Sequence, residues 1–268
     1  MTKVHSYFGI CNICGYKGEF SLSGSFLRES YNCPSCRASL RYRDQAALII
    51  DEFGKGQSIF LQHMVGQNLL DNVWIYETAL RGPFVHLFKK LPNYYRSYLW
   101  EDRSLGDVDQ DGVRCEDLTQ LTFSDNLFDL VITSDVMEHV YDFKKAFAEI
   151  NRVLKPGGVH IFTIPNQWPL PKNTESRVAV IDGVEHFLKP PRYHNAGDGD
   201  RCIVYHDYGA DLIDILDSFG CKTQVVRRHS GLDVCYVNAT FISRKMGNSL
   251  STSYVASSDL KSYSVGKR

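Results

Sequence analysis

Residues 129–164 read DLVITSDVMEHVYDFKKAFAEINRVLKPGGVHIFTI, and this stretch decides the fold. It begins with an apolar β-type run at residues 129–134 and ends with a second one at residues 159–164. Between them the apolar spacing predicts a helix over residues 142–154, followed by the helix-ending Lys-Pro-Gly-Gly of residues 155–158. One face of that helix has Phe143, Ala146, Phe147, Ile150, Val153 and Leu154. Strand, helix and strand in this order are typical of a parallel sheet with covering helices.

The same alternation extends outward on both sides of this stretch. Residues 73–77, 98–101 and 113–118 are further β-type runs, and residues 85–91 form a helical run between the first two of them. On the carboxyl side, a helix with Leu212, Leu216 and Phe219 ends at Gly220, and the runs 222–228 and 234–242 favour an antiparallel pair at one sheet edge. We therefore predict an α/β fold with a doubly wound, mostly parallel sheet over residues 70–245.

Two tight cysteine pairs lie near the N-terminus, Cys11 with Cys14 and Cys33 with Cys36, separated by 18 residues. Four thiolates in this spacing suit a tetrahedral Zn²⁺ ion, and a closed four-cysteine shell would make that ion structural. The alternatives are disulfides or a redox pair. We expect a small zinc ribbon over residues 1–40, which has little core of its own, and a helical linker over residues 41–69.

Three arginines, Arg37, Arg41 and Arg43, follow the second cysteine pair closely. They could contact phosphates, as a ribbon that recognises RNA would require. The alternative is an ordinary solvated helix face.

Composition gives no sign of a charged or membrane-bound protein. The 268 residues have 30 Lys and Arg against 31 Asp and Glu, a formal net charge of −1, and no apolar run long enough for a bilayer. We expect a cytoplasmic protein. Residues 165–201 exceed an ordinary connection and are a candidate insertion over the site, and the serine-rich tail 246–268 is expected to be disordered.

Acidic residues end successive predicted strands of the sheet, at Glu77, Glu101 and Asp117. Ligands of open parallel sheets bind at the carboxyl ends of the strands, and carboxylates accept hydrogen bonds from a ribose diol and from amino groups. The alternative is three unrelated loop acids with capping or surface roles.

Several motifs together resemble the class I S-adenosylmethionine-dependent methyltransferases. They are EDL at residues 116–118, FDLV at residues 128–131 with Glu138-His139 after it, and RVLKPGG at residues 152–158. The resemblance covers residues 70–165. It implies that Glu101 binds the ribose hydroxyls and Asp117 the adenine amino group of S-adenosylmethionine, with Glu77 near the methionine amino group. The complete cofactor set expected is Glu77, Arg81, Gly82, Glu101, Asp117, Leu118, Thr133, Ser134 and Asp135.

The sequence departs from the family at its first motif, which is normally an acid followed by a glycine-rich turn. Here Glu77 is followed by Thr-Ala-Leu-Arg-Gly-Pro at residues 78–83. Each added Cβ takes room that a glycine would leave to the ligand. Arg81 either reaches the methionine carboxylate or faces solvent.

Three histidines are candidate catalytic residues: His139, His186 and His206. Histidine has a suitable pKa for a general base. His139 follows the fourth strand, where a structural or cofactor-side role is the alternative. His186 and His206 lie in and after the insertion, and His206-Asp207 could instead cap the following helix.

These features predict a zinc-ribbon methyltransferase that uses S-adenosylmethionine and a structural Zn²⁺. The acceptor is expected to be a sugar, a glycan intermediate or another small molecule. Two alternatives stay open: an RNA methyltransferase whose ribbon recognises its substrate, and a binding protein whose methyltransferase fold has lost activity.

Overall fold

A seven-stranded sheet forms the centre of the protein, in the strand order β14-β15-β7-β6-β3-β4-β5. The computed structural model describes residues 5–23, 26–56, 60–166, 168–195, 199, 201–227 and 239–247. Strands β3 to β7 are parallel to one another, and β15 is antiparallel to both β7 and β14. The strands are β3 (Ile75–Glu77), β4 (Tyr94–Tyr98), β5 (Val113–Cys115), β6 (Phe128–Ser134), β7 (Leu154–Thr163), β14 (Cys221–Val226) and β15 (Thr240–Lys245). The predicted mostly parallel α/β fold is confirmed.

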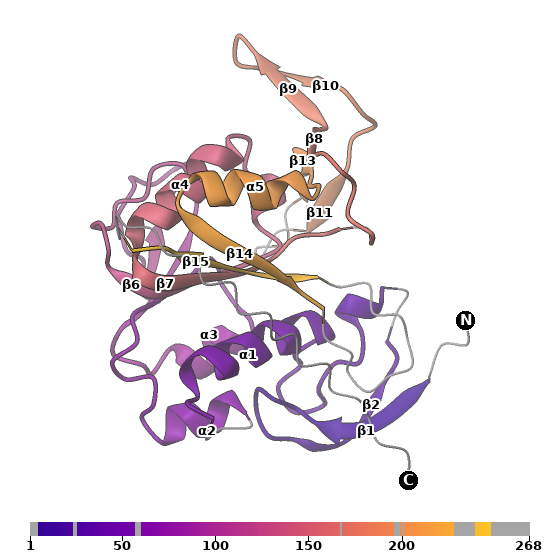
Figure 1. Ribbon diagram of the computed structural model, residues 1–268, viewed down its shortest axis with the longest axis vertical. Coiled ribbons are helices and arrows are strands. Elements are labelled where there is room, and N and C mark those ends of the chain that lie inside the picture. The colour runs from indigo at the N-terminus through magenta and orange to yellow at the C-terminus, as the bar shows by residue number, and fades with distance from the viewer. Residues whose placement is uncertain are drawn as a thin grey trace, which may run out of the picture.

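Helices cover both faces of this sheet (Figure 1). Helices α1 (Leu40–Phe53), α2 (Leu61–Gly66) and α3 (Pro83–Phe88) lie on one side, and α4 (Phe143–Val153) and α5 (Asp211–Ser218) lie on the other. Helix α4 begins where Asp142 accepts a hydrogen bond from the backbone N–H of Lys145, and it buries the apolar face that the sequence predicts. The sheet is therefore doubly wound, as expected.

Residues 85–91, the predicted helical run between the first two strands, overlap helix α3, where Pro83 starts a helix whose Phe84, Val85 and Phe88 are buried. Two predicted strand boundaries need correction. The second strand lies earlier than residues 98–101, at Tyr94–Tyr98. The predicted break at residues 155–158 is part of β7, where a register shift opposite β6 accommodates it.

The predicted antiparallel strand pair at the sheet edge is present, but its second strand ends later than predicted. Gln224 of β14 pairs with Ile242 of β15, and β15 continues to Lys245. The beginning of the predicted second run, residues 234–238, lies outside the described residues, as does the tail from residue 248 onward.

The N-terminal segment has a hairpin of β1 (Ser6–Ile10) and β2 (Lys17–Ser21) and a short turn η1 (Leu27–Glu29). Its buried side chains belong to the same apolar cluster as one face of the sheet: Ile13 and Phe20 join Ile49 of α1 and Ile161 of β7 in that cluster. The expected domain bounds at residues 40 and 69 stay predictions.

Residues 175–207, which include most of the predicted insertion, add short strand pairs after β7. They are β9 (Val178–Ile181) with β10 (Val184–Phe187), β11 (Tyr193–Asn195) with β12 (Arg201–Ile203), and β8 (Glu175–Ser176) with β13 (His206–Asp207). The β9–β10 hairpin projects from the molecule at the top of Figure 1. Among the described residues, no helix is both long and apolar enough to span a membrane.

Replacing Phe162 by alanine should lower the free energy of unfolding by about 3–5 kcal/mol, the usual cost of removing a buried phenylalanine. Its ring is fully buried in β7 and stacks 4.8 Å from Phe241 and 4.5 Å from His160. Urea titration followed by tryptophan fluorescence measures the change. The control is Phe187→Ala in β10, where the ring is 45% exposed and the cost should stay within about 0.5 kcal/mol. Equal effects of the two variants would contradict the packing described here.

Candidate active site and cysteine cluster

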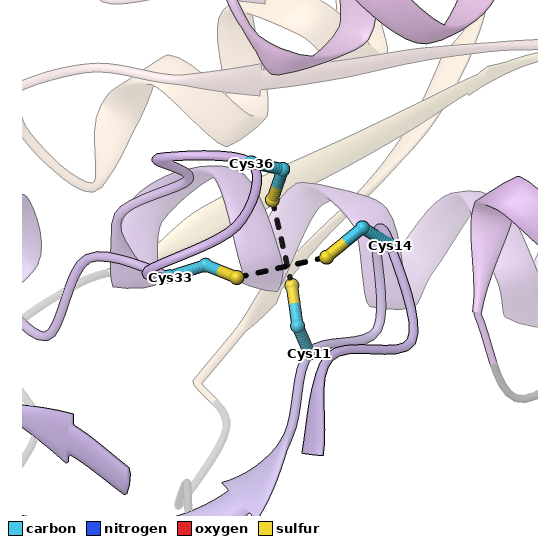
Figure 2. A group of neighbouring side chains, drawn as sticks. All are labelled: Cys11, Cys14, Cys33 and Cys36. Carbon is cyan, nitrogen blue, oxygen red and sulfur yellow. Dashed lines mark hydrogen bonds between the residues drawn. The ribbon is translucent and has the colours of Figure 1, made fainter. Parts of the chain in front are cut away.

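The two cysteine pairs meet in one cluster (Figure 2). The sulfurs of Cys11 and Cys36 are 3.7 Å apart, those of Cys14 and Cys33 are 3.6 Å apart, and all four lie within 4.8 Å of one another. Tetrahedral coordination with Zn–S bonds of about 2.3 Å places sulfurs roughly 3.8 Å apart. The predicted grouping of these cysteines is therefore confirmed.

Each cysteine pair closes a tight backbone turn of the same kind. Gly15 donates its N–H to the Cys11 carbonyl at 2.8 Å, and Arg37 donates to the Cys33 carbonyl at 2.9 Å. Both residues have positive φ, 77° and 64°. Glycine is needed at the first turn, because a Cβ there would also lie 3.0 Å from the Phe60 ring.

The cysteine turns also contact α1 and α2. Leu61 and Gln62, at the start of α2, donate backbone N–H groups to the carbonyls of Asn12 and Ile13 at 2.9 and 2.8 Å. The Asn12 side chain donates to the Arg43 carbonyl in α1 at 2.6 Å. The cluster thus fixes the position of both helices.

Glu77 ends β3 and is only 2% exposed. The Tyr94 hydroxyl donates a hydrogen bond to its Oε2 atom at 2.6 Å. Burial raises the pKa of the Glu77 carboxyl to about 7, because the hydrogen bond and the charge of Arg96 offset the desolvation only in part. A cationic ligand group would restore the ionised form.

The irregular turn after Glu77 is held from two sides. Arg96 of β4 donates to the Leu80 carbonyl at 2.8 Å. Gly82 has φ of 150°, and a Cβ at this position would lie 3.3 Å from the Tyr42 hydroxyl of α1. Within the described structure the buried Thr78 hydroxyl has no hydrogen-bond partner, and Arg81 is exposed. The exposure of Arg81 agrees with the alternative that it faces solvent. Its contact with the methionine carboxylate of the cofactor stays a prediction.

Glu101 and Asp117 follow the adjacent strands β4 and β5, so both lie at the carboxyl edge of the sheet next to β3. Glu101 is exposed. Asp117 is half-buried and accepts a hydrogen bond from the Thr119 N–H at 2.8 Å, while Leu118 is buried. The neighbouring Glu116 has a structural role, since it accepts hydrogen bonds from Arg114 and Thr122.

Helix α1 lies over the end of β6, where Thr133, Ser134 and Asp135 were expected to line the cofactor. The Ser134 hydroxyl donates to the Gln45 side chain at 2.8 Å, and Gln45 donates to the Thr133 carbonyl at 3.3 Å. The buried Thr133 hydroxyl lies 2.9 Å from His160 Nε2. These side chains thus already have protein partners.

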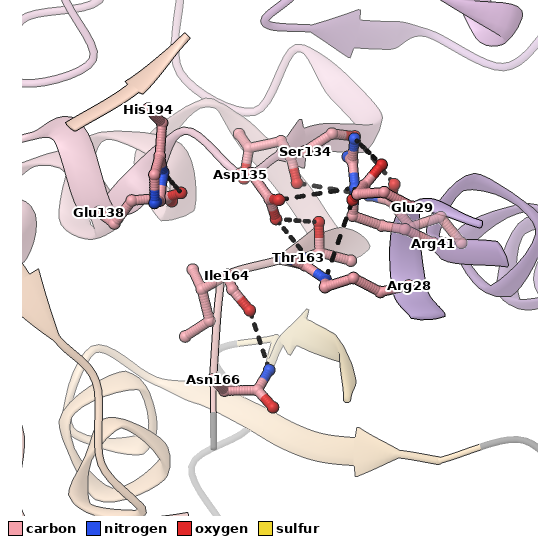
Figure 3. Close-up of polar contacts among 12 residues, drawn as sticks. Arg28, Glu29, Arg41, Ser134, Asp135, Glu138, Thr163, Ile164, Asn166 and His194 are labelled. Atoms are coloured by element: carbon pink, nitrogen blue, oxygen red, sulfur yellow. Dashed lines mark hydrogen bonds and ion pairs between the residues drawn. The ribbon is translucent and has the colours of Figure 1, made fainter. Parts of the chain in front are cut away.

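Asp135 joins the N-terminal segment to the sheet through ion pairs and hydrogen bonds (Figure 3). Its carboxylate accepts hydrogen bonds from Arg28 at 2.7 Å and from the Thr163 hydroxyl at 2.9 Å, and Arg41 Nε lies 3.5 Å away. Burial favours a higher pKa for Asp135, but the two guanidinium groups outweigh it and lower the pKa below its ordinary value. Arg41 also donates to Glu29 at 2.6 Å.

Neither interpretation of Arg41 and Arg43 from the sequence is correct, because both side chains are buried. Arg41 pairs with Glu29 and Asp135. Arg43 donates to the Tyr31 carbonyl at 3.1 Å and lies 4.4 Å over the Phe20 ring. Of the three arginines, Arg37 alone is exposed.

The three candidate histidines have different surroundings. His139, in the turn η2 (Met137–His139), donates Nδ1–H to the Ile203 carbonyl at 2.6 Å. His186 is exposed on β10. His206 is buried, with Nε2 2.8 Å from the Tyr141 carbonyl and Nδ1 3.4 Å from the Ser176 hydroxyl, and burial lowers its pKa. Their catalytic roles stay predictions.

The pairing of Glu138 with His194 has no signal in the sequence. His194 Nδ1 lies 3.3 Å from the Glu138 carboxylate, although 56 positions separate the two residues. No local pattern relates them, because the contact depends on where β11 lies relative to the end of β6. Only the separate Glu-His motif of residues 138–139 was visible.

A pocket of about 270 Å³ opens beyond the carboxyl end of β7. Its wall includes Tyr208, whose hydroxyl donates to the Met137 carbonyl at 2.8 Å. Charged groups line one side: Asp207 pairs with Lys189 at 3.0 Å and with Arg192 at 2.9 Å, and Lys189 also pairs with Glu175. The pocket thus combines a charged side with apolar wall residues, and through Tyr208 it adjoins the turn that contains Glu138 and His139.

A family model described as a methyltransferase domain matches residues 100–162 of this chain. The match includes Glu101, Asp117 and the end of β6, and it begins after the irregular turn at residues 78–83. It agrees with the resemblance to methyltransferases that the motifs indicate.

Two further comparisons concern individual proteins. An uncharacterized protein of Methanocaldococcus jannaschii is 43% identical over 76 residues, which are 28% of this chain and 31% of that protein. Among solved structures, a methyltransferase from Mesorhizobium loti aligns at 17% identity with a TM-score of 0.42, covering 64% of this chain and 90% of that one. A sugar N-methyltransferase from a Streptoalloteichus species aligns at 17% identity with a TM-score of 0.43, covering 86% and 98%.

Without added cofactor, the free energy of unfolding should fall by about 1 kcal/mol more between pH 6 and pH 8 in the wild type than in Glu77→Gln. The folded carboxyl has a pKa of about 7 against an ordinary 4.5, so the folded state holds an extra proton that it loses over this interval. Chemical denaturation at both pH values measures the difference. Exposed Glu101→Gln is the control and should keep the wild-type pH dependence. The same slope in Glu77→Gln and in the wild type would refute the shifted pKa.

Proposed function

We propose that this protein is an S-adenosylmethionine-dependent methyltransferase whose acceptor is a small polar molecule. The proposal rests on the family match at residues 100–162 together with carboxylates at the ends of three adjacent strands, Glu77, Glu101 and Asp117. In such a reaction the acceptor attacks the methyl carbon in line with the sulfonium, which leaves as a thioether. The cofactor supplies the reactive methyl group, so the protein mainly orients the two molecules.

The residues at the carboxyl edge fit this cofactor. Glu101 would bind the ribose hydroxyls and Asp117 the adenine amino group through the carboxylate oxygen that Thr119 leaves available. Glu77 would accept a hydrogen bond from the methionine ammonium, which gives a buried carboxyl a cationic partner. The unpartnered Thr78 hydroxyl in the same turn is a further donor or acceptor for the ligand.

We place the acceptor in the pocket beyond β7, covered by the strand pairs of residues 165–201. Its mixture of Lys189, Arg192 and Asp207 suits a molecule with several hydrogen-bonding groups, such as a sugar or a glycan intermediate. Burial of Arg41 and Arg43 removes two of the three arginines that RNA recognition would use. We therefore favour the small-molecule acceptor over RNA.

Of the three histidines, we propose His139 as the general base that accepts a proton from the acceptor. It follows β6 directly, and its contact with the Ile203 carbonyl leaves Nε2 as the ring nitrogen with a lone pair. Both ring nitrogens of His206 have protein neighbours, and His186 projects on the β9–β10 hairpin.

We also propose that the four N-terminal cysteines bind one structural Zn²⁺ ion. The sulfur separations fit a tetrahedral site, and four thiolates would leave no coordination position for a substrate. The ion would hold the two cysteine turns together, and through them the position of α1 over the end of β6.

The affinity for S-adenosylmethionine should fall roughly 10- to 100-fold in Glu101→Ala, because the ribose loses charge-assisted hydrogen bonds. Isothermal titration calorimetry measures this. Asp102→Ala, the adjacent exposed acid, is the matched control and should bind like the wild type. An absence of binding to the wild type at millimolar cofactor would end the methyltransferase proposal.

Binding without methyl transfer would instead favour the alternative of a binding protein with a methyltransferase fold. The turn at residues 78–83, with alanine and arginine in place of glycines, is the observation behind this alternative. A single-turnover assay with radiolabelled cofactor and candidate sugars separates the two.

Purified protein should contain about one zinc ion per chain at the cysteine cluster, and the double variant Cys11→Ser, Cys14→Ser should lose it. Mass spectrometry of the metal content measures this. Cys202→Ser, in β12, serves as the control because Cys202 lies outside the cluster. Retention of that zinc by the double variant would contradict the four-thiolate site.

A further inference from the structure

We propose that Glu138, His139 and His194 bind a divalent transition-metal ion beside the acceptor pocket. We call these three residues the Glu-His-His triad. They come from two separated parts of the chain, the turn η2 after β6 and the strand β11 of the insertion.

The ligand atoms of the triad are close enough to share one ion. His194 Nδ1 and His139 Nε2 lie 3.3 and 3.6 Å from Glu138 Oε1, and the three ligand atoms fall within 4.8 Å of one another. Metal–ligand bonds of about 2.1 Å at angles between 90° and 110° place neighbouring ligand atoms roughly 3.0–3.4 Å apart. The separations from Glu138 therefore need little adjustment on binding.

The burial of the Glu138 carboxylate supports a metal site independently of the distances between the ligand atoms. Its side chain is 1% exposed, and within the described structure neither carboxylate oxygen has a hydrogen-bond partner. Two histidine rings face this carboxylate, as Figure 3 shows for His194. A buried, unsatisfied carboxylate is costly, and a cation between it and the imidazoles would compensate for that cost.

His139 is already oriented as a metal ligand. A carbonyl oxygen only accepts hydrogen bonds, so the 2.6 Å contact with Ile203 places a proton on Nδ1. In the neutral ring, Nε2 presents its lone pair toward Glu138, which is unfavourable beside a carboxylate unless a cation lies between the two groups. A backbone carbonyl that fixes the other ring nitrogen is a common second-shell partner of metal-binding histidines.

The surrounding backbone holds the triad in place. Tyr205 donates its N–H to the Glu138 carbonyl at 2.8 Å, and Tyr208 donates its hydroxyl to the Met137 carbonyl. The pairing of His194 with Cys202 fixes β11. The insertion is thus anchored to η2 at several points, which keeps His194 near Glu138.

Two imidazoles and one carboxylate favour Mn²⁺, Fe²⁺, Co²⁺ or Zn²⁺ over Mg²⁺ or Ca²⁺, which prefer oxygen ligands. Three protein ligands leave coordination positions open. Since the proposed acceptor pocket adjoins η2, an acceptor oxygen bound to the ion would lose its proton more readily, and His139 would then act on the acceptor as a metal ligand and not as a general base. This acceptor role rests on the proposed function, whereas metal binding does not.

Manganese is the probe that tests the triad by itself, because thiolate sites select softer metals. The full chain is dialysed with chelator until one zinc ion per chain remains and is then titrated with Mn²⁺, and the free ion is measured by electron paramagnetic resonance. We expect one Mn²⁺ per chain, and we expect the Mn²⁺ affinity to be at least about 100-fold lower in Glu138→Gln and in His194→Ala. Replacing a residue that only orients a metal ligand lowers metal affinity by up to about 100-fold, so loss of a ligand itself should cost at least as much. His186→Ala, next to Glu185 in the exposed Glu-His pair of β10, should bind like the wild type.

Absence of Mn²⁺ binding at millimolar metal, or equal affinity in the two triad variants and the wild type, would overturn the proposal and leave a Glu138–His194 ion pair only. Thermal unfolding checks that each variant is folded. Should Glu138→Gln fail to fold, His194→Ala still decides, because that side chain is 31% exposed. Calorimetry with S-adenosylmethionine on the same samples separates loss of the metal site from failure of the proposed function.

Discussion

The ion pairs at Asp135 are the interaction on which the arrangement of this protein depends. Asp135 directly follows β6 with a positive φ of 55°, and its carboxylate faces Arg28 from the segment between the cysteine pairs and Arg41 from α1. A half-buried carboxylate without such partners would be destabilising, so the end of β6 needs the N-terminal segment in place. The same contacts place α1 against the edge where cofactor binding is proposed.

This dependence explains why the N-terminal segment shares its apolar core with the sheet. Few of its residues are apolar enough to form a separate core, and the cysteine turns supply the local order through Gly15, Arg37 and the contacts to α2. Arg28, Arg41 and Arg43 form ion pairs and hydrogen bonds within this packing. Of Arg37, Arg41 and Arg43, Arg37 alone faces solvent.

The insertion has a corresponding role on the other side of the sheet edge. Its strands bring His194 to Glu138 and the ion-paired residues Lys189 and Arg192 to the pocket. Two chain segments that are distant in sequence thus border the carboxyl ends of β6 and β7. In our proposals the cofactor contacts come from the sheet, and the acceptor contacts come largely from the insertion.

The sequence by itself determined the features that depend on local pattern. The cysteine spacing predicted the thiol cluster, and apolar periodicity predicted β6, α4 and the antiparallel strand pair, because residues a few positions apart specify these elements. Tertiary structure decided the rest: Arg41 and Arg43 are buried, and His194 contacts Glu138. Such contacts join distant parts of the chain, so burial and charge pairing at those positions follow only once the sheet and its insertions have packed.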